Sequence, residues 1–118
     1  MDLRLLFLSI VYTKLMISDT QLIECLKFAE EQLQQAKVIA GRHYRKIDHF
    51  SLKADMSPVT RADTEINNLV GEHIRQNFPD HGFFGEEGAF GLDRELLWVL
   101  DPIDGTKSFM CGVPVFTC

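Results

Sequence analysis

Asp101 and Asp104 lie three residues apart in the hexapeptide DPIDGT, which directly follows the apolar run 96–100. Two carboxylates on a tight turn at the end of a strand can point at one cation, and such strand ends form the ligand crevice of α/β sheets. A hard divalent cation such as Mg²⁺ prefers carboxylate and carbonyl oxygens, and Ile103 can add its backbone carbonyl. The hexapeptide therefore predicts a site for a divalent cation.

Gly105 and Thr106 complete this hexapeptide. Glycine allows a ligand to approach the backbone closely, and two successive amides can cradle a phosphate group. An ordinary turn needs one Asp and one Gly, but it needs neither the second Asp nor the Thr. The segment therefore indicates a cation site beside a phosphate site rather than a simple turn.

A second acidic cluster, Glu86 and Glu87, is bracketed by Gly85 and Gly88. Bringing these carboxylates close to the DPIDGT segment is costly unless a counter-charge is present, and a bound cation would supply it. Taken alone, a glutamate pair is more often a solvated acidic turn. Both interpretations stay open.

Asp63 belongs to a third segment, VTRAD at 59–63. A carboxylate at the start of a helix interacts favourably with the helix dipole, and spacing alone favours that structural role. The functional alternative is that Asp63 joins the other two acidic clusters.

Two helices are expected to position these clusters. Ser18 and Gln21 fit a capping box at the start of the first helix. Gly41 is a plausible end, although the pattern continues toward Tyr44. The expected buried face follows steps of four and three residues: Leu22, Leu26, Ala29, Leu33, Ala36 and Ala40. We expect this face to pack on the protein's own core rather than on a partner helix.

The second helix is predicted to begin at Thr60 or Arg61, after a loop over 49–59, and to end before the Phe78-Pro79 pair. Its expected buried positions are Ala62, Ile66, Leu69 and Ile74. The run 96–100 is apolar on both alternating sets, as in a strand covered on both faces. The tail 113–118 resembles the start of another strand.

Composition limits the function classes. The 118 residues include 12 Lys and Arg against 17 Asp and Glu, for a net charge of −5. Without a cationic run, binding to nucleic acid or to an anionic membrane is not expected. The 46% hydrophobic content is that of a single folded domain. Three cysteines without a CxxC pair indicate a reducing compartment, here the cytoplasm.

Residues 1–15 are expected to be an N-terminal extension. The apolar stretch Leu5–Tyr12 is too short to span a bilayer, which takes about 20 apolar residues. No small-residue cleavage site follows it, so an extension before Met16 is favoured over a secretory signal.

Three motifs together carry a resemblance: PVTRAD at 58–63, GEE at 85–87 and DPIDGTKSF at 101–109. In order and approximate spacing they resemble the inositol monophosphatase-like family of Mg²⁺-dependent phosphatases, over about 19–116. The KSF continuation, the KAD loop at 53–55 and FPDHG at 78–82 look most like the histidinol-phosphate phosphatase branch. Inositol monophosphatases themselves more often read TNF after DGT.

The resemblance implies an α/β fold, namely the N-terminal part of a layered α/β/α/β/α sandwich, with two long helices followed by sheet strands. Residues 16–118 would form the N-terminal portion of that domain. The family's second half supplies a further metal-binding aspartate in a WDxAAG-like segment, and this half is expected to be absent. An uncovered sheet edge can pair with a second chain, so a homodimer is one expectation.

The resemblance also implies how a metal cluster would be held. Glu86, Asp101, Asp104 and the carbonyl of Ile103 would hold two or three Mg²⁺ ions, with Glu87 as a neighbouring carboxylate. The cluster would activate a water molecule that attacks the phosphorus of a small phosphorylated metabolite.

Four residues receive other roles by the same resemblance. Asp63 would accept a hydrogen bond from the Thr106 hydroxyl, so that Thr106 orients the attacking water. The amides of Gly105 and Thr106 would bind phosphate. Lys53 lies near the position of a loop lysine that approaches the family's metal site.

The expected function is therefore a metal-dependent phosphomonoesterase, with histidinol phosphate of histidine biosynthesis as the leading substrate. Two alternatives stay open. One is a phosphatase for inositol 1-phosphate or a related sugar phosphate, and the other is a truncated, non-catalytic chain that binds metal. A calcium module is disfavoured because no DxDxDG-type loop is present.

Overall fold

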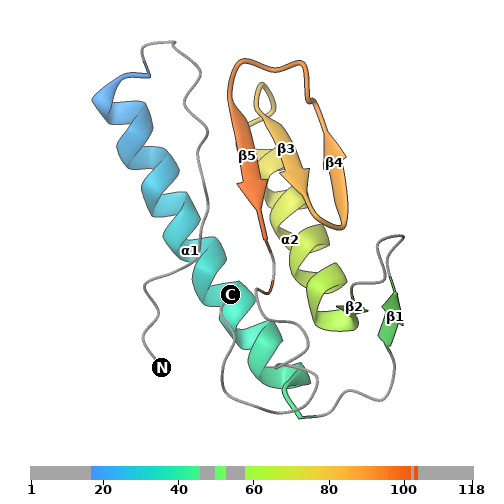
Figure 1. Cartoon of the computed structure of the whole chain (residues 1–118). Coiled ribbons are helices and arrows are strands. Elements are labelled where there is room, and N and C mark those ends of the chain that lie inside the picture. The colour runs from blue at the N-terminus through green and yellow to red at the C-terminus, as the bar shows by residue number, and fades with distance from the viewer. Residues whose placement is uncertain (1–16, 46–49, 53–57, 102, 104–118) are drawn as a thin grey trace.

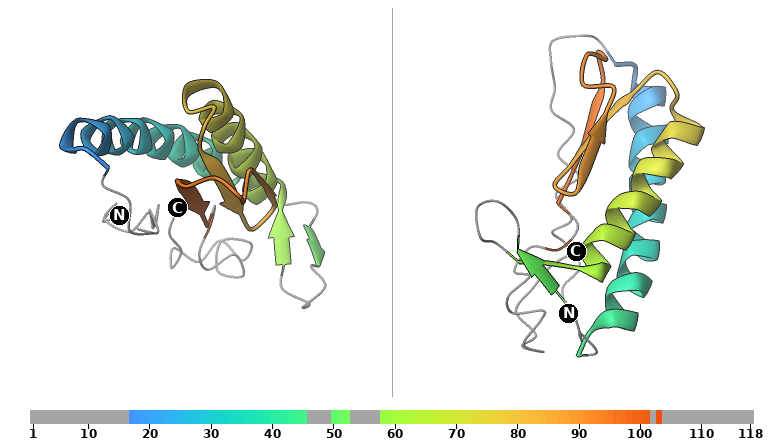
Figure 2. Two further views of the ribbon diagram at one scale, coloured as in Figure 1. Left: turned by 90° about the horizontal axis from the view of Figure 1, so that it is seen from above. Right: turned by 90° about the vertical axis from the view of Figure 1, so that its right-hand side faces the viewer.

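The computed structural model describes residues 17–45, 50–52, 58–101 and 103. The elements are α1 (Asp19–His43), β1 (Phe50–Leu52), β2 (Pro58–Thr60), α2 (Arg61–Asn77), β3 (Gly82–Gly85), β4 (Gly88–Phe90) and β5 (Leu97–Leu100). The two helices run antiparallel and cover one face of the sheet formed by β3, β4 and β5 (Figures 1 and 2). The expected order of two long helices followed by sheet strands is confirmed. None of the helices in these ranges is long and apolar enough to cross a membrane.

The predicted capping box starts α1. The Ser18 hydroxyl accepts a hydrogen bond from the Gln21 amide at 3.2 Å. In return, the Ser18 amide donates to Gln21 Oε1 at 3.1 Å. Two backbone donors at the start of the helix, which have no partner within the helix itself, are satisfied in this way.

The end of α1 lies beyond Gly41, so the predicted break there is wrong and the continuation toward Tyr44 is confirmed. Arg42 Nη1 and His43 Nε2 lie 3.0 and 2.7 Å from the two carboxylate oxygens of Glu65 in α2. These contacts hold the last turn of α1 against α2. They therefore offset the destabilising effect of the conformationally free Gly41 within the helix.

The buried face of α1 differs from the predicted one. Its buried side chains are Cys25, Phe28, Gln32, Ala36, Ile39 and Ala40. Leu26, a predicted core position, is 55% exposed. The true face is turned by roughly one residue because Gln32 faces α2, where its Oε1 lies 2.6 Å from Nδ1 of His73. A search for apolar residues alone passes over such a buried polar position.

The second helix largely follows its prediction. Thr60 is the N-cap, α2 ends at Asn77, and Phe78 is the C-cap. The predicted core positions Ala62, Ile66 and Ile74 are each 0% exposed. Leu69 is half-buried at the edge of this face.

The loop predicted over 49–59 is partly wrong, because β1 and β2 pair antiparallel there. Each strand has three residues, which is too short for an alternating pattern to emerge from the turn-forming residues around it. Strand β4, which was also not predicted, pairs antiparallel with β3 and is equally short.

The main sheet has the order β4-β3-β5, with β3 and β5 parallel. Phe83, Trp98 and Leu100 are each 2% exposed. Phe83 contacts α2, where a Cβ on Gly71 would lie 3.1 Å from its ring, so glycine allows the helix to lie this close to the sheet. Their neighbours Leu97 and Val99 are only half-buried, so cover on both faces of β5 is confirmed only in part.

An aromatic cluster joins α1 to the sheet. Phe28 lies 5.0 Å from Phe78 and 5.3 Å from Trp98, measured between ring centroids. His81 stacks on Phe78, and its Nδ1 accepts a hydrogen bond of 3.0 Å from Trp98 Nε1. Partial burial lowers the pKa of His81 below its ordinary value of 6.5, and the nearby charge of Asp80 opposes this shift.

The adjacent Phe83 and Phe84 provide a test of this sheet orientation. Phe83→Ala should lower the free energy of unfolding by about 3–5 kcal/mol, because it leaves a cavity under α2. Phe84 is 48% exposed, so Phe84→Ala should cost about 1 kcal/mol or less. Urea unfolding followed by circular dichroism measures both values, and equal losses would contradict the assigned faces.

His81 should make stability depend on pH. Because its folded pKa is lowered, its contribution is fully present above pH 6.5 and is lost as the pH falls through that value toward the folded pKa. Protonation of Nδ1 would also remove the acceptor for Trp98. Urea unfolding between pH 8 and 5 should show a shallower pH dependence for His81→Gln than for the unmodified chain. Identical slopes for the two proteins would refute this role.

Candidate functional site

The parallel pairing of β3 with β5 brings two acidic segments to one edge of the sheet. Gly85 lies opposite Leu100 in the register, and each is the last residue of its strand. Glu86 and Asp101 therefore follow at neighbouring strand ends. The carboxyl ends of adjacent parallel strands are where ligands of α/β sheets bind.

These acidic residues differ in their exposure. Glu86 is exposed, whereas Glu87 and Asp101 are half-buried. Oε1 of Glu87 and Oδ1 of Asp101 are both buried from solvent. Ile103 is 2% exposed, so its side chain lies in the core. Burial of carboxylate oxygens favours their neutralisation by a cation or by hydrogen-bond donors.

Asp63 lies at the third position of α2 and is 1% exposed. Its Oδ2 accepts hydrogen bonds from the Thr60 amide at 2.8 Å and from the Thr60 hydroxyl at 2.5 Å. The predicted structural role of this carboxylate at a helix start is confirmed. The pairing of Asp63 with Thr106 stays a prediction, because Thr106 lies outside the described residues.

Asn67 belongs to this region and was missed by the sequence analysis. It is 3% exposed, and its Oδ1 accepts a hydrogen bond of 3.4 Å from the Glu87 amide. Its only signal in the sequence is that it follows Asp63 by four residues, which places both on one face of α2. Neutral asparagine carries no acid–base chemistry, so the residue types did not point to it.

The donor types fit a hard cation. Carboxylates of Glu86, Glu87 and Asp101 lie at strand ends on one edge, and oxygen ligands are those that Mg²⁺ prefers. Within the described ranges, no three His, Cys, Asp or Glu side chains converge closely enough to hold a metal ion. The predicted ligand set also includes Asp104, which lies outside those ranges, as do Lys53 and Gly105.

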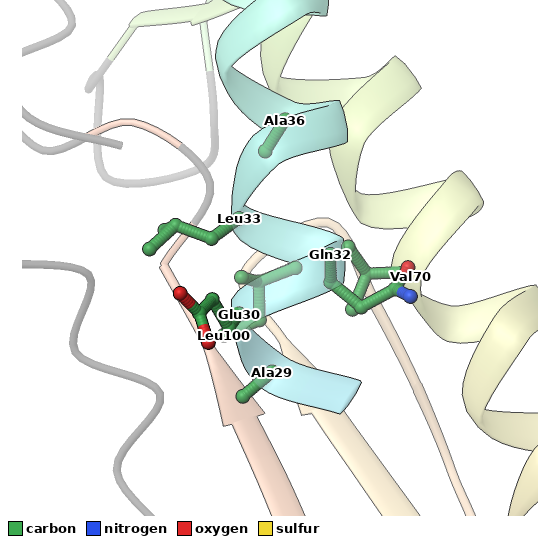
Figure 3. A pocket seen from close by; sticks show the side chains of 7 residues that line it. All are labelled: Ala29, Glu30, Gln32, Leu33, Ala36, Val70 and Leu100. Atoms are coloured by element: carbon green, nitrogen blue, oxygen red, sulfur yellow. The ribbon is translucent and has the colours of Figure 1, made fainter. Parts of the chain in front are cut away.

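A separate cavity of about 180 Å³ lies between the helices and β5 (Figure 3). Its lining consists of Ala29, Glu30, Gln32, Leu33, Ala36, Val70 and Leu100. Five of these seven residues are apolar, and Glu30 and Gln32 supply the polar groups of the lining. Ala29 and Leu33, which were predicted to lie in the core, are only half-buried because they line this cavity.

Three comparisons bear on the family. The histidinol-phosphatase of Chlorobaculum parvum is 41% identical over 104 residues, covering 86% of this chain and 38% of that protein. The chloroplastic bifunctional phosphatase IMPL2 of Arabidopsis thaliana is 39% identical over 103 residues, covering 85% and 30%. A solved IMPase of Thermotoga maritima superposes with a TM-score of 0.71 at 35% identity, and the match covers 79% of this chain and 37% of that structure.

The chain thus spans between 30% and 38% of the length of these curated relatives. Residues 21–118, which include all three acidic segments, match the inositol monophosphatase family. Members of this family are phosphatases that depend on a metal ion. The order of the elements, the acidic edge of the sheet and the sequence match agree, and the chain belongs to the inositol monophosphatase family.

Proposed function

We propose that this chain is part of a Mg²⁺-dependent phosphomonoesterase whose leading substrate is histidinol phosphate. The observation that carries the proposal is the register of β3 and β5, which aligns Gly85 with Leu100. The acidic turn after β3 and the DPIDGT segment after β5 therefore start from neighbouring points. A phosphate monoester is a dianion, so it needs positive charge at such an edge.

The ligands of the cations would be Glu86, Asp101, Asp104 and the carbonyl of Ile103, and we propose two or three Mg²⁺ ions. When bound, these ions supply positive charge for the phosphoryl oxygens and for the leaving alkoxide. The backbone amides of Gly105 and Thr106 would donate hydrogen bonds to the phosphate group.

Water activation is assigned to Thr106 and Asp63. Asp63 would accept a hydrogen bond from the Thr106 hydroxyl group, so that Thr106 orients the attacking water. The support for this role is that Asp63 is buried and is held at the start of α2 by Thr60. A carboxylate held in this way loses little conformational entropy when it orients a second hydroxyl group.

The choice of substrate rests on similarity. The histidinol-phosphatase at 41% identity supports histidinol phosphate. The inositol 1-phosphate alternative is supported by the 35% identity to a solved IMPase. The sequence favours the first, because KSF rather than TNF follows DGT at 107–109.

The preference for histidinol phosphate over inositol 1-phosphate is tested by measuring phosphate release from each by the purified chain in the presence of Mg²⁺. We expect kcat/KM for histidinol phosphate to exceed that for inositol 1-phosphate by about tenfold or more, as for substrates that differ in several polar contacts. The reverse order would favour the inositol phosphate alternative. Mg²⁺ binding by calorimetry without release from either substrate would support the non-catalytic, metal-binding alternative.

Asp101→Asn tests the assignment of the cation ligands. It should lower Mg²⁺-dependent phosphate release by about 100-fold or more, because loss of a ligand charge removes several kcal/mol of transition-state stabilisation. Asp93→Asn, at an exposed position in the β4–β5 connection, is the matched control and should keep full activity. Activity retained in the Asp101 variant would refute the ligand role.

A further inference from the structure

We propose that Asn67 is a positioning residue for the cation site. In this role it holds the turn 85–88, so that Glu86, the proposed cation ligand on this turn, stays at the sheet edge where Asp101 follows β5. The inference rests on the proposed function, because it assumes that a cation binds at this edge of the sheet. Helix α2 would then contribute two residues to the proposed site, Asp63 and Asn67.

The side chain of Asn67 lies against the turn at several points. Its Oδ1 accepts a hydrogen bond from the Glu87 amide at 3.4 Å. A Cβ on Gly85 would overlap the same Oδ1, and a Cβ on Gly88 would lie 3.4 Å from Nδ2. The amide group of Asn67 therefore bridges both ends of the turn. This close contact explains why glycine precedes Glu86.

Glu86 and Glu87 lie on a tight turn between two strands. Gly85 and Gly88 are the last pair of the β3–β4 ladder, so Glu86 and Glu87 form a two-residue connection beyond it. Glycines on both sides allow such a connection to vary its backbone angles. A buried contact from a long helix limits that freedom. Asn67 is well suited to this because it is 3% exposed and lies in the middle of α2.

The chemical type of Asn67 also fits this role. Asn67 lies four residues after Asp63 on the same helix and accepts its hydrogen bond from the backbone amide of the acidic residue Glu87. An amide oxygen accepts a hydrogen bond from the turn without adding a further negative charge beside them. Partners that orient metal ligands in this way typically change metal affinity by about 10–100-fold when they are removed.

The test uses Tb³⁺ as an oxygen-seeking probe and Mg²⁺ as its competitor. Trp98 is the only tryptophan of the chain and lies three residues before Asp101, so it can sensitise Tb³⁺ luminescence at this site. Asn67→Ala should weaken Tb³⁺ binding and Mg²⁺ competition by about tenfold or more. Asn67→Asp keeps an oxygen acceptor for the Glu87 amide and should recover most of the lost affinity, because the bound cation offsets the charge that this variant adds.

Two controls separate positioning from general stability. Asn68→Ala changes the exposed neighbour on the same helix and should leave the affinity unchanged. Ile74→Val removes a methyl group from a fully buried position of α2, so it should lower the melting temperature but not the cation affinity. If Asn67→Ala does not fold, Asn67→Ser takes its place, because its hydroxyl group is too short to reach the Glu87 amide.

The outcomes are distinguishable. If the unmodified chain binds neither Tb³⁺ nor Mg²⁺, the cation site is refuted together with the proposed function and with this inference. If the unmodified chain binds both ions and the Ala or Ser variant binds them equally well, only the role of Asn67 is overturned. Weaker binding in that variant, restored in Asn67→Asp, supports the inference.

Discussion

The parallel pairing of β3 with β5 is the contact on which the arrangement of the acidic residues depends. It brings together two segments that are separated by the whole of β4 and the following connection. In this register Phe83 lies beside Trp98, and both are buried. A shift of one residue would turn either side chain to the other face of the sheet. Hydrophobic burial therefore sets the register, and the register sets which carboxylates become neighbours.

The two helices contribute unequally to this arrangement. Helix α1 contributes buried side chains to the core, and it is joined to α2 by the Gln32–His73 hydrogen bond and by the contacts of Arg42 and His43 with Glu65. Helix α2 carries both the core and the site on adjoining faces. Ile66 is fully buried in the core, whereas Asp63 and Asn67 are buried at the acidic edge. The site is therefore built on a helix that the core already fixes.

The sequence predicted most of this architecture from local signals. The capping box of Ser18, the start of α2 at Thr60 and the apolar run of β5 each depend on neighbouring residues, and all three were predicted correctly. The exact buried face of α1 was not, because Gln32 is buried through a partner 41 residues away. Asn67 was missed for the same reason, since its contact with Glu87 is a property of the fold. The helix-start role of Asp63 is local, and it was correctly predicted.

Helix α2 rigidly connects the aromatic cluster to Asp63. The first turn of α2 carries Asp63, and just beyond its last turn Phe78 packs against Phe28 and Trp98. A helix of 17 residues is about 25 Å long and bends little, so it behaves as a rigid rod. Tilting such a rod by about 5° around one end displaces the other end by ~2 Å. The packing of the Phe28, Phe78 and Trp98 rings therefore limits how far the Asp63 carboxylate can move. A change in the packing of these rings would shift Asp63 at the other end of the helix.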